Sequence, residues 1–235
     1  MANNYFEFKQ FLIRQCYSAF KVGTDGVILG SSADVAGVNN ALDIGAGTGL
    51  VALMLAQRCD ARITAIEPDA GSFQDLLLNI ENCKWEERIA AVDTDLQHFS
   101  PSRKFDLIVS NPPWFSNSLR NPDQGKAGAR HKDLLTDDDL LSGVDRLIED
   151  EGRFVVIMPA SEGKKFIAEA LEHGLFCNAV MKIRPLPSSA VNRLVLTFCR
   201  NKLPLSEKEL TISTGRRHEY TEEYVLLTKD FYLKF

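Results

Sequence analysis

The segment Asn111-Pro112-Pro113-Trp114 carries the most chemical information in this chain of 235 residues. It ends the apolar run 105–110, and a β-strand cannot pair through two prolines, because proline lacks the backbone N–H and fixes φ. The chain must therefore turn here. The turn leaves the Asn111 side-chain oxygen and the Pro112 carbonyl facing outward as acceptors beside the Trp114 ring. Two acceptors and a flat ring are suited to hold a planar amino group.

An amino group held in this way can accept a methyl group. The exocyclic nitrogen of adenine is a poor nucleophile, because its lone pair is delocalised into the ring. If Asn111 Oδ1 and the Pro112 carbonyl each accept one N–H, the nitrogen moves toward tetrahedral geometry and its lone pair points at the methyl group. Trp114 would stack on the base, a contact worth roughly 1–3 kcal/mol. We therefore predict Asn111, Pro112 and Trp114 as catalytic residues. Alone, the segment also fits a plain loop with a core tryptophan.

Composition places the chain among ordinary globular proteins, of a size for one large α/β domain or two small ones. Neither a membrane span nor a signal peptide is predicted, so the cytoplasm is the expected location. Five scattered cysteines without a C-x-x-C pair indicate reduced packing residues, and four dispersed histidines predict no metal site. The net charge of −5 argues mildly against nucleic acid as a partner.

Positive charge is nevertheless concentrated in three places. The first follows the predicted base pocket and contains Arg120, Lys126, Arg130, His131 and Lys132. The second is Arg216-Arg217-His218 near the end of the chain, and the third contains Lys9, Arg14 and Lys21. Each cluster alone is also typical of a solvated face. Three clusters around one pocket would form a compact rim that binds phosphates.

Apolar runs alternate with helical patterns, which predicts a parallel sheet with helices on both faces. Strands are expected at 41–44, 63–66, 89–92, 106–110 and 152–158, and helices at 50–58, 72–82 and 137–149. The late runs 177–183 and 193–198 indicate an antiparallel pair that finishes the sheet, and the tail 221–235 is helical or irregular. We expect an N-terminal extension over 1–35 that contributes to the site, followed by one α/β domain over 36–235.

The segment Asp43–Gly49, DIGAGTG, follows the first predicted strand and opens a helix, as a nucleotide-binding loop does. A nicotinamide site is disfavoured, because its fingerprint requires glycine where Leu50 stands. Glu67 ends the next strand, at the spacing at which a carboxylate accepts hydrogen bonds from ribose hydroxyls. The alternative for the glycine-rich loop is a tight packing turn, and the alternative for Glu67 is a surface glutamate before Pro68.

Two further segments could complete a cofactor site. Asp95 falls just beyond the third strand, where it could accept a hydrogen bond from an adenine amino group, and Asp93 is the alternative. In the segment 21–26, KVGTDG, backbone amides and Thr24 could hold a carboxylate, and Asp25 an amino group. This segment is also compatible with a turn before a helix that begins near Val27. All these positions lie where doubly wound sheets bind ligands.

Together, the loop Asp43–Gly49, Glu67, Asp95 and the segment 111–114 resemble those of Rossmann-type S-adenosylmethionine-dependent methyltransferases that act on planar amino nitrogens. Further similarity points to the bacterial family that methylates N6 of adenine 37, beside the anticodon of valine tRNA. It lies in FKQF (8–11), KVGTDG (21–26), ALMLAQR (52–58), YTEEY (220–224) and DFYL (230–233). The resemblance spans nearly the whole chain.

The resemblance implies a Rossmann-like fold with a seven-stranded, mostly parallel sheet and an antiparallel last strand. It also implies S-adenosyl-L-methionine as cofactor and tRNA as substrate. The cofactor-binding residues that we expect are Lys21, Thr24, Asp25, Gly26, Asp43, Gly45, Ala46, Gly47, Glu67, Pro68, Asp95 and Asn111. Contacts with tRNA are expected from Lys9, Arg120, Lys126, Arg130, Lys132, Arg216 and Arg217. Tyrosine is commoner than tryptophan at position 114 in such enzymes, and Trp114 preserves the stacking surface.

Two other functions fit the same residues. The segment 111–114 also suits the amide nitrogen of a protein glutamine, which would make the chain a protein N-methyltransferase. A non-catalytic module that binds cofactor and RNA is the second alternative. The basic region 120–132 and the family-like ends of the chain favour RNA methylation.

Overall fold

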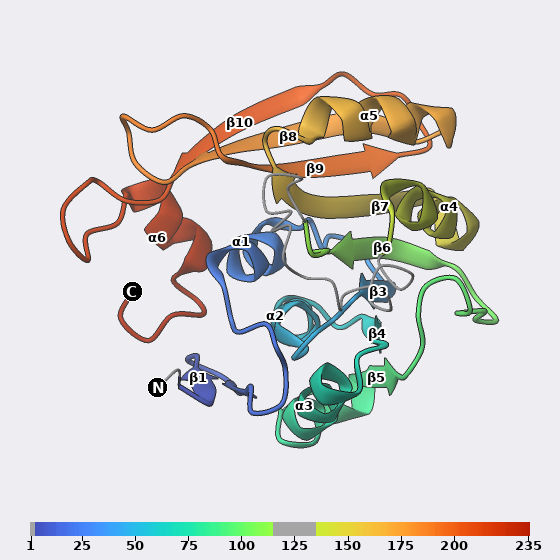
Figure 1. Cartoon of the computed structure of the whole chain (residues 1–235), viewed down its shortest axis with the longest axis horizontal. Coiled ribbons are helices and arrows are strands. Elements are labelled where there is room, and N and C mark those ends of the chain that lie inside the picture. The colour runs from blue at the N-terminus through green and yellow to red at the C-terminus, as the bar shows by residue number, and fades with distance from the viewer. Residues whose placement is uncertain (1–2, 115–134) are drawn as a thin grey trace, which may run out of the picture.

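The computed structural model of this chain describes residues 3–114 and 135–235 (Figure 1). Its elements, in chain order, are β1 (Tyr5–Glu7), β2 (Leu12–Arg14), α1 (Thr24–Ser32), β3 (Asn40–Ile44), α2 (Leu50–Arg58), β4 (Arg62–Ile66), α3 (Ala70–Glu81), the 3-10 turn η1 (Glu86–Arg88), β5 (Ile89–Val92), β6 (Phe105–Ser110), α4 (Asp137–Leu147), β7 (Ile148–Pro159), α5 (Gly163–Glu172), β8 (Phe176–Arg184), β9 (Arg193–Cys199), β10 (Ser206–Thr211) and α6 (Glu222–Thr228).

The main sheet has eight strands among the described residues, in the order β10-β8-β9-β7-β6-β3-β4-β5. Strand β9 runs antiparallel to β7 and β8, and the other neighbouring pairs are parallel. The seven predicted strands are all present, with the last of them antiparallel as expected. The predicted count is corrected to eight by β10. Its sequence, SEKELT, is charged and mostly exposed, so it lacks the apolar pattern by which strands are found.

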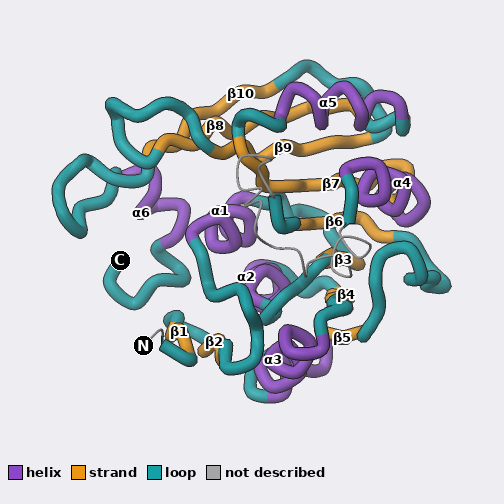
Figure 2. Tube along the Cα trace, in the orientation of Figure 1, coloured by secondary structure: helices purple, strands orange, loops and turns teal. Residues whose placement is uncertain are grey.

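Helices cover both faces of the sheet, which confirms the predicted α/β fold (Figure 2). Successive residues of a strand point to opposite faces. In β3, Ala41 accordingly packs with α1, α2 and α3, whereas Leu42 packs with α4 and α5. Helix α6 joins the first group through Tyr224. Each face therefore has its own buried apolar cluster. A ligand can bind at the loops that follow the carboxyl ends of the parallel strands.

The N-terminal residues form a β1–β2 hairpin that the sequence does not predict. The hairpin packs on the C-terminal tail, where the Phe8 and Tyr232 rings stack at 5.9 Å. Helix α1 begins at Thr24, earlier than the expected position near Val27, because Gly23 provides an extended N-cap. Ile13 and Ile28 belong to the same buried cluster as α2, so the extension 1–35 is packed onto the rest of the fold.

Candidate functional site

The glycine loop and the segment 111–114 emerge side by side from neighbouring strands. Ile44, the last residue of β3, pairs with Ser110, the last residue of β6, and Ser110 Oγ donates to the Ile44 carbonyl at 3.0 Å. Gly45 and Asn111 therefore start about 4.8 Å apart, one strand spacing. The chain continues from β3 to β4 on one side, whereas β6 lies on the other. Doubly wound sheets bind ligands at such a reversal of strand order.

The glycine loop leaves an open cradle at this edge. The Gly45 and Ala46 N–H groups donate to the Ile66 carbonyl, both at 3.0 Å. Gly45 and Gly47 have φ of 67° and 57°, in the left-handed region that favours glycine. A Cβ at either position would meet no heavy atom within 4 Å. This loop thus presents bare backbone to free space, which fits a nucleoside-type cofactor.

Glu67 fixes this loop from the end of β4. Its side chain is buried, Oε2 accepts from Gly47 N at 2.8 Å, and Oε1 accepts from Asp69 N at 2.8 Å. Burial raises the pKa of Glu67, while the two backbone hydrogen bonds oppose the shift. Each carboxylate oxygen has a second lone pair. The geometry therefore fits a bidentate contact with two hydroxyls, beside the exposed Pro68.

Asp43 lies beneath the loop, with only 1% of its surface exposed. Its Oδ2 accepts from Ala52 N at 3.0 Å and so caps the first turn of α2. Burial raises the pKa of Asp43 to about 7, and the nearby Glu67 charge adds to the shift. Asp43 therefore positions the start of α2, and its direct contact with a cofactor stays a prediction.

The acidic residues after β5 have different surroundings. Both Asp95 oxygens lie close to His98 Nδ1, at 2.7 and 2.8 Å, and Oδ1 also accepts from His98 N at 2.8 Å. These contacts, led by the backbone hydrogen bond, lower the pKa of Asp95. Asp93 is exposed, and its charge contributes to the raised pKa of Glu67. His98 thus fixes the Asp95 carboxylate near the surface, and its predicted adenine contact stays a prediction.

The segment 21–26 reaches the site through Gly26. A Cβ on Gly26 would lie 3.8 Å from Asn111 Nδ2 and 3.0 Å from Leu50 Cδ2, so α1, α2 and Asn111 meet there. Lys21 Nζ instead donates to the carbonyls of Gln15 and Ser18. The exposed Thr24 begins α1.

Asp25 has a partner that the sequence does not predict. Its Oδ2 accepts from Arg193 Nε at 2.8 Å. Because β9 runs antiparallel, its first residue, Arg193, lies at the edge where the parallel strands end. A single sequence gives no signal for this pairing across 168 positions.

The segment 111–114 combines an exposed acceptor with a fixed ring. Asn111 is exposed and Pro112 is buried. Trp114 Nε1 donates to the Ile157 carbonyl at 2.8 Å, and its ring contacts Phe166 edge-to-face with centroids 5.9 Å apart. A cavity of about 230 Å³ lies beside the segment. Its lining includes Pro112, Pro113, Trp114, Leu140, Pro159 and Glu162. The aromatic surface thus lines a cavity instead of being lost in the core.

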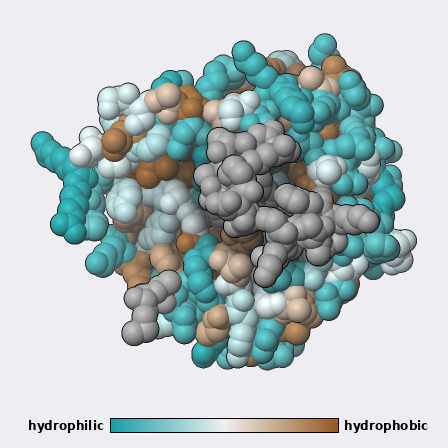
Figure 3. Space-filling model, in the orientation of Figure 1, coloured by the Kyte–Doolittle hydropathy of each residue, from teal (hydrophilic) through white to brown (hydrophobic). Residues whose placement is uncertain are grey.

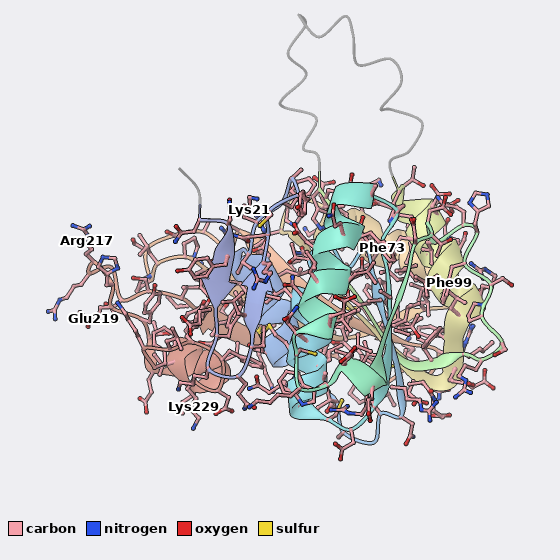
Figure 4. All side chains as sticks on the ribbon, turned by 90° about the horizontal axis from the view of Figure 1, so that it is seen from below. Lys21, Phe73, Phe99, Arg217, Glu219 and Lys229 are labelled. Carbon is pink, nitrogen blue, oxygen red and sulfur yellow. The ribbon has the colours of Figure 1, made fainter. Side chains whose placement is uncertain are left out.

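Two basic clusters can be placed in the fold. The loop after β10 carries Arg216, which pairs with Glu219 at 3.6 Å, and Arg217, which projects outward (Figure 4). Because β10 is parallel to β6, this loop leaves the same edge of the sheet as Asn111. Figure 3 shows predominantly hydrophilic surface around the smaller apolar areas of this view. The predicted contacts Arg120, Lys126, Arg130 and Lys132 lie outside the described residues.

Lys9 does not belong to the expected rim. Its Nζ donates to the carbonyls of Lys229 and Phe235, at 2.6 and 2.7 Å. Lys9 also lines a surface hollow with Gln57 and Arg58, at the end of α2. Helix α2 starts at the glycine loop and rises about 13 Å along its axis, so Lys9 lies at the opposite end. The expectation that Lys9 joins a rim around the pocket is corrected by this position.

Two absences apply to the described part of the chain. Within 3–114 and 135–235, no group of three or more His, Cys, Asp or Glu side chains could hold a metal ion. No helix in these ranges is long and apolar enough to cross a membrane.

Comparison with known proteins identifies the class. A model of the methyltransferase small domain matches residues 15–128. The crystal structure of a predicted O-methyltransferase from Agrobacterium tumefaciens has a TM-score of 0.68 at 17% identity, covering 88% of this chain and 96% of that one. That of TYW2 from P. horikoshii, in complex with MeSAdo, has a TM-score of 0.60 at 16% identity, covering 84% and 71%. The fold and the site define a Rossmann-like methyltransferase.

Two curated relatives narrow the class to a family. A tRNA1(Val) (adenine(37)-N6)-methyltransferase from Phocaeicola vulgatus is 44% identical over 233 residues, 99% of each chain. One from Trichodesmium erythraeum is 40% identical over 240 residues, 100% of each chain. The chain belongs to the family of tRNA1(Val) (adenine(37)-N6)-methyltransferases. The predicted enzyme class, the resemblance and S-adenosyl-L-methionine as cofactor are confirmed.

Proposed function

We propose that this protein transfers the methyl group of S-adenosyl-L-methionine to N6 of adenine 37 in valine tRNA, and that Asn111, Pro112 and Trp114 hold that adenine. The pairing of Ile44 with Ser110 carries the proposal, because it sets the cofactor loop beside the acceptors for the amino group. The names of the full-length relatives support this substrate.

The residues around the glycine loop fit the cofactor, which supplies an electrophilic methyl group on a sulfonium. Gly45, Ala46 and Gly47 would present backbone to it, since their loop borders open space. Glu67 would accept hydrogen bonds from the ribose hydroxyls, and Asp95 would accept one from the adenine amino group. Further contacts are proposed for Asp43 and for the segment 21–26, which reaches the site at Gly26.

The acceptors at the end of β6 bind and orient the amino group of the substrate. Asn111 Oδ1 and the Pro112 carbonyl accept the two N–H groups of N6 and direct its lone pair toward the methyl group. They also stabilise the positive charge that develops on N6, before water removes the extra proton. The Trp114 ring is fixed by its hydrogen bond to Ile157, so it can stack on the base with little loss of side-chain entropy.

The RNA must present an unpaired adenine. Rotating a base out of its stack costs a few kcal/mol, and least where the RNA is single-stranded, as in an anticodon loop. Arg216 and Arg217 follow β10. Strand β10 lies four strand spacings from β6, which is about 19 Å. That distance suits phosphates beyond the target nucleotide. The proposal also includes contacts with tRNA from Arg120, Lys126, Arg130 and Lys132. It places the protein in the cytoplasm, where tRNA is found.

The test is methyl transfer with identified product. The protein is incubated with radiolabelled cofactor and total tRNA, and the product is treated with ribonuclease or protease. We expect label that is sensitive to ribonuclease, recovered as N6-methyladenosine at position 37 of valine tRNA. Label sensitive only to protease would support glutamine methylation, and binding of cofactor and RNA without transfer would support a non-catalytic module.

A further inference from the structure

The loop before α1 carries two of the exposed large apolar side chains. We call residues 15–22 the strap. Within it, Tyr17 and Phe20 are 57% and 66% exposed, and neither residue belongs to a buried core cluster. Exposed aromatic rings beside a nucleic-acid site offer faces on which bases can stack.

The backbone under these rings is held rigidly. Asp75, fully buried in α3, accepts from Cys16 N at 3.1 Å, Tyr17 N at 2.9 Å and Ser18 N at 2.7 Å. Ser18 Oγ also donates to the Phe20 carbonyl at 2.8 Å. A platform fixed in this way loses little conformational entropy when a partner binds.

The strap runs along the edge of the sheet that holds the site. The Tyr17 carbonyl lies 2.8 Å from where a Cβ of Gly71 would be, so it packs on the first turn of α3, just after Glu67. At its other end the strap leads into α1, where Gly26 meets Asn111. Figure 4 shows Lys21, in the strap, at the end of the molecule where α3 begins.

Charge and side-chain chemistry favour RNA as the molecule that binds the strap. From Arg14 to Thr24 the chain has Arg14 and Lys21 but no Asp or Glu, within a protein of net charge −5. Unpaired nucleobases stack on aromatic side chains, and a nearby positive charge favours the RNA backbone. We propose that Tyr17 and Phe20 form a stacking surface for unpaired nucleobases next to the target adenine. This inference rests on the proposed function and adds to it residues that contact the substrate.

Binding of labelled valine tRNA to the full chain tests the inference. Tyr17→Ala and Phe20→Ala should each weaken tRNA binding on the order of tenfold, the loss expected for a stacked base. Phe20→Trp should bind nearly as well as wild type, whereas Phe20→Leu should not, because it retains apolar surface without a ring. The ratio between wild type and Phe20→Ala should stay constant as salt rises, since no charge is removed. Leu226→Ala, at a residue that is 56% exposed on α6, is the matched control and should bind like wild type.

Three results would overturn the inference while the proposed function stands. In the first, the alanine variants bind tRNA as tightly as wild type. In the second, they lose cofactor affinity, measured by calorimetry, in parallel with tRNA affinity. In the third, their mass in sedimentation differs from that of wild type, which would mark the rings as a contact between copies of this chain. Thermal melting checks that each variant is folded. A wild-type protein that neither binds nor methylates valine tRNA would refute the proposed function, and the inference with it.

Discussion

At the scale of single residues, Asn111 has the most specific role. Replacing it with alanine removes one of two acceptors for the amino group, so we expect turnover to fall by roughly 10²–10³-fold or more. Cofactor affinity should be nearly intact, and Asn111→Asp, which retains an acceptor oxygen, should keep part of the activity. Rates and calorimetric affinities give the answer. A joint loss of turnover and cofactor binding would mean that Asn111 acts through the cofactor site or the local fold, and would contradict a role confined to the amino group.

Asp43 makes stability depend on pH. Its pKa is about 7 in the folded chain against an ordinary value of 3.8, so the folded state binds more protons between these values. Stability from this group is therefore present below about pH 4 and is lost as pH rises to about 7. Asp43→Asn cannot ionise but can still accept from Ala52 N.

The stability of Asp43→Asn minus that of wild type should be greater at about pH 8 than at about pH 4. For a chain of this size, each kcal/mol corresponds to about 2–4 °C in Tm. Melting curves at both values measure the difference. A variant whose Tm follows that of wild type at every pH would show that Asp43 has an ordinary pKa.

At the scale of elements, Asp75 connects α3 to the strap through three backbone N–H groups. Asp75→Asn leaves at least one of these donors without an acceptor, which costs about 1–3 kcal/mol. We expect a lower Tm and faster hydrogen exchange at residues 16–18. Glu81→Gln, an exposed change on the same helix, should alter neither. Unchanged exchange in Asp75→Asn would mean that the strap is held by other contacts.

Strongly patterned elements could be predicted from the sequence, and weakly patterned ones could not. Strands β3 to β9 carry apolar runs that predict them, whereas the charged β10 and the short β1–β2 hairpin have no such pattern. The candidate site follows the same rule. The glycine loop and the segment 111–114 are local motifs, but the pairing of Asp25 with Arg193 depends on strand order, which a local pattern does not contain.

At the scale of the whole molecule, Lys9 joins the two ends of the chain. Its ammonium group caps the C-terminal segment at Lys229 and Phe235. Lys9→Ala should therefore lower Tm by a few degrees, since an exposed charged hydrogen bond contributes about 1 kcal/mol. Its tRNA affinity should equal that of wild type. A clear loss of tRNA binding in a stably folded Lys9→Ala protein would restore the residue to the RNA interface.

Binding of tRNA should depend on salt, because the protein is acidic overall and local basic clusters must attract the phosphates. Each lost phosphate contact lowers the slope of log affinity against log salt by about 0.7 for single strands. The double variant Arg216→Ala with Arg217→Ala should thus reduce the slope by about 1.4. Affinities measured at several salt concentrations test this. A slope equal to that of wild type would exclude both arginines from the interface.

The central claim is that the corner after β6 holds the amino group of adenine 37 beside the methyl donor. The most direct measurement is a crystal structure of the protein with a bound cofactor analogue and the anticodon stem-loop of valine tRNA. We expect N6 of the adenine within about 3 Å of both Asn111 Oδ1 and the Pro112 carbonyl, with the base stacked on Trp114. An adenine bound elsewhere, or with N6 directed away from these two oxygens, would contradict the account.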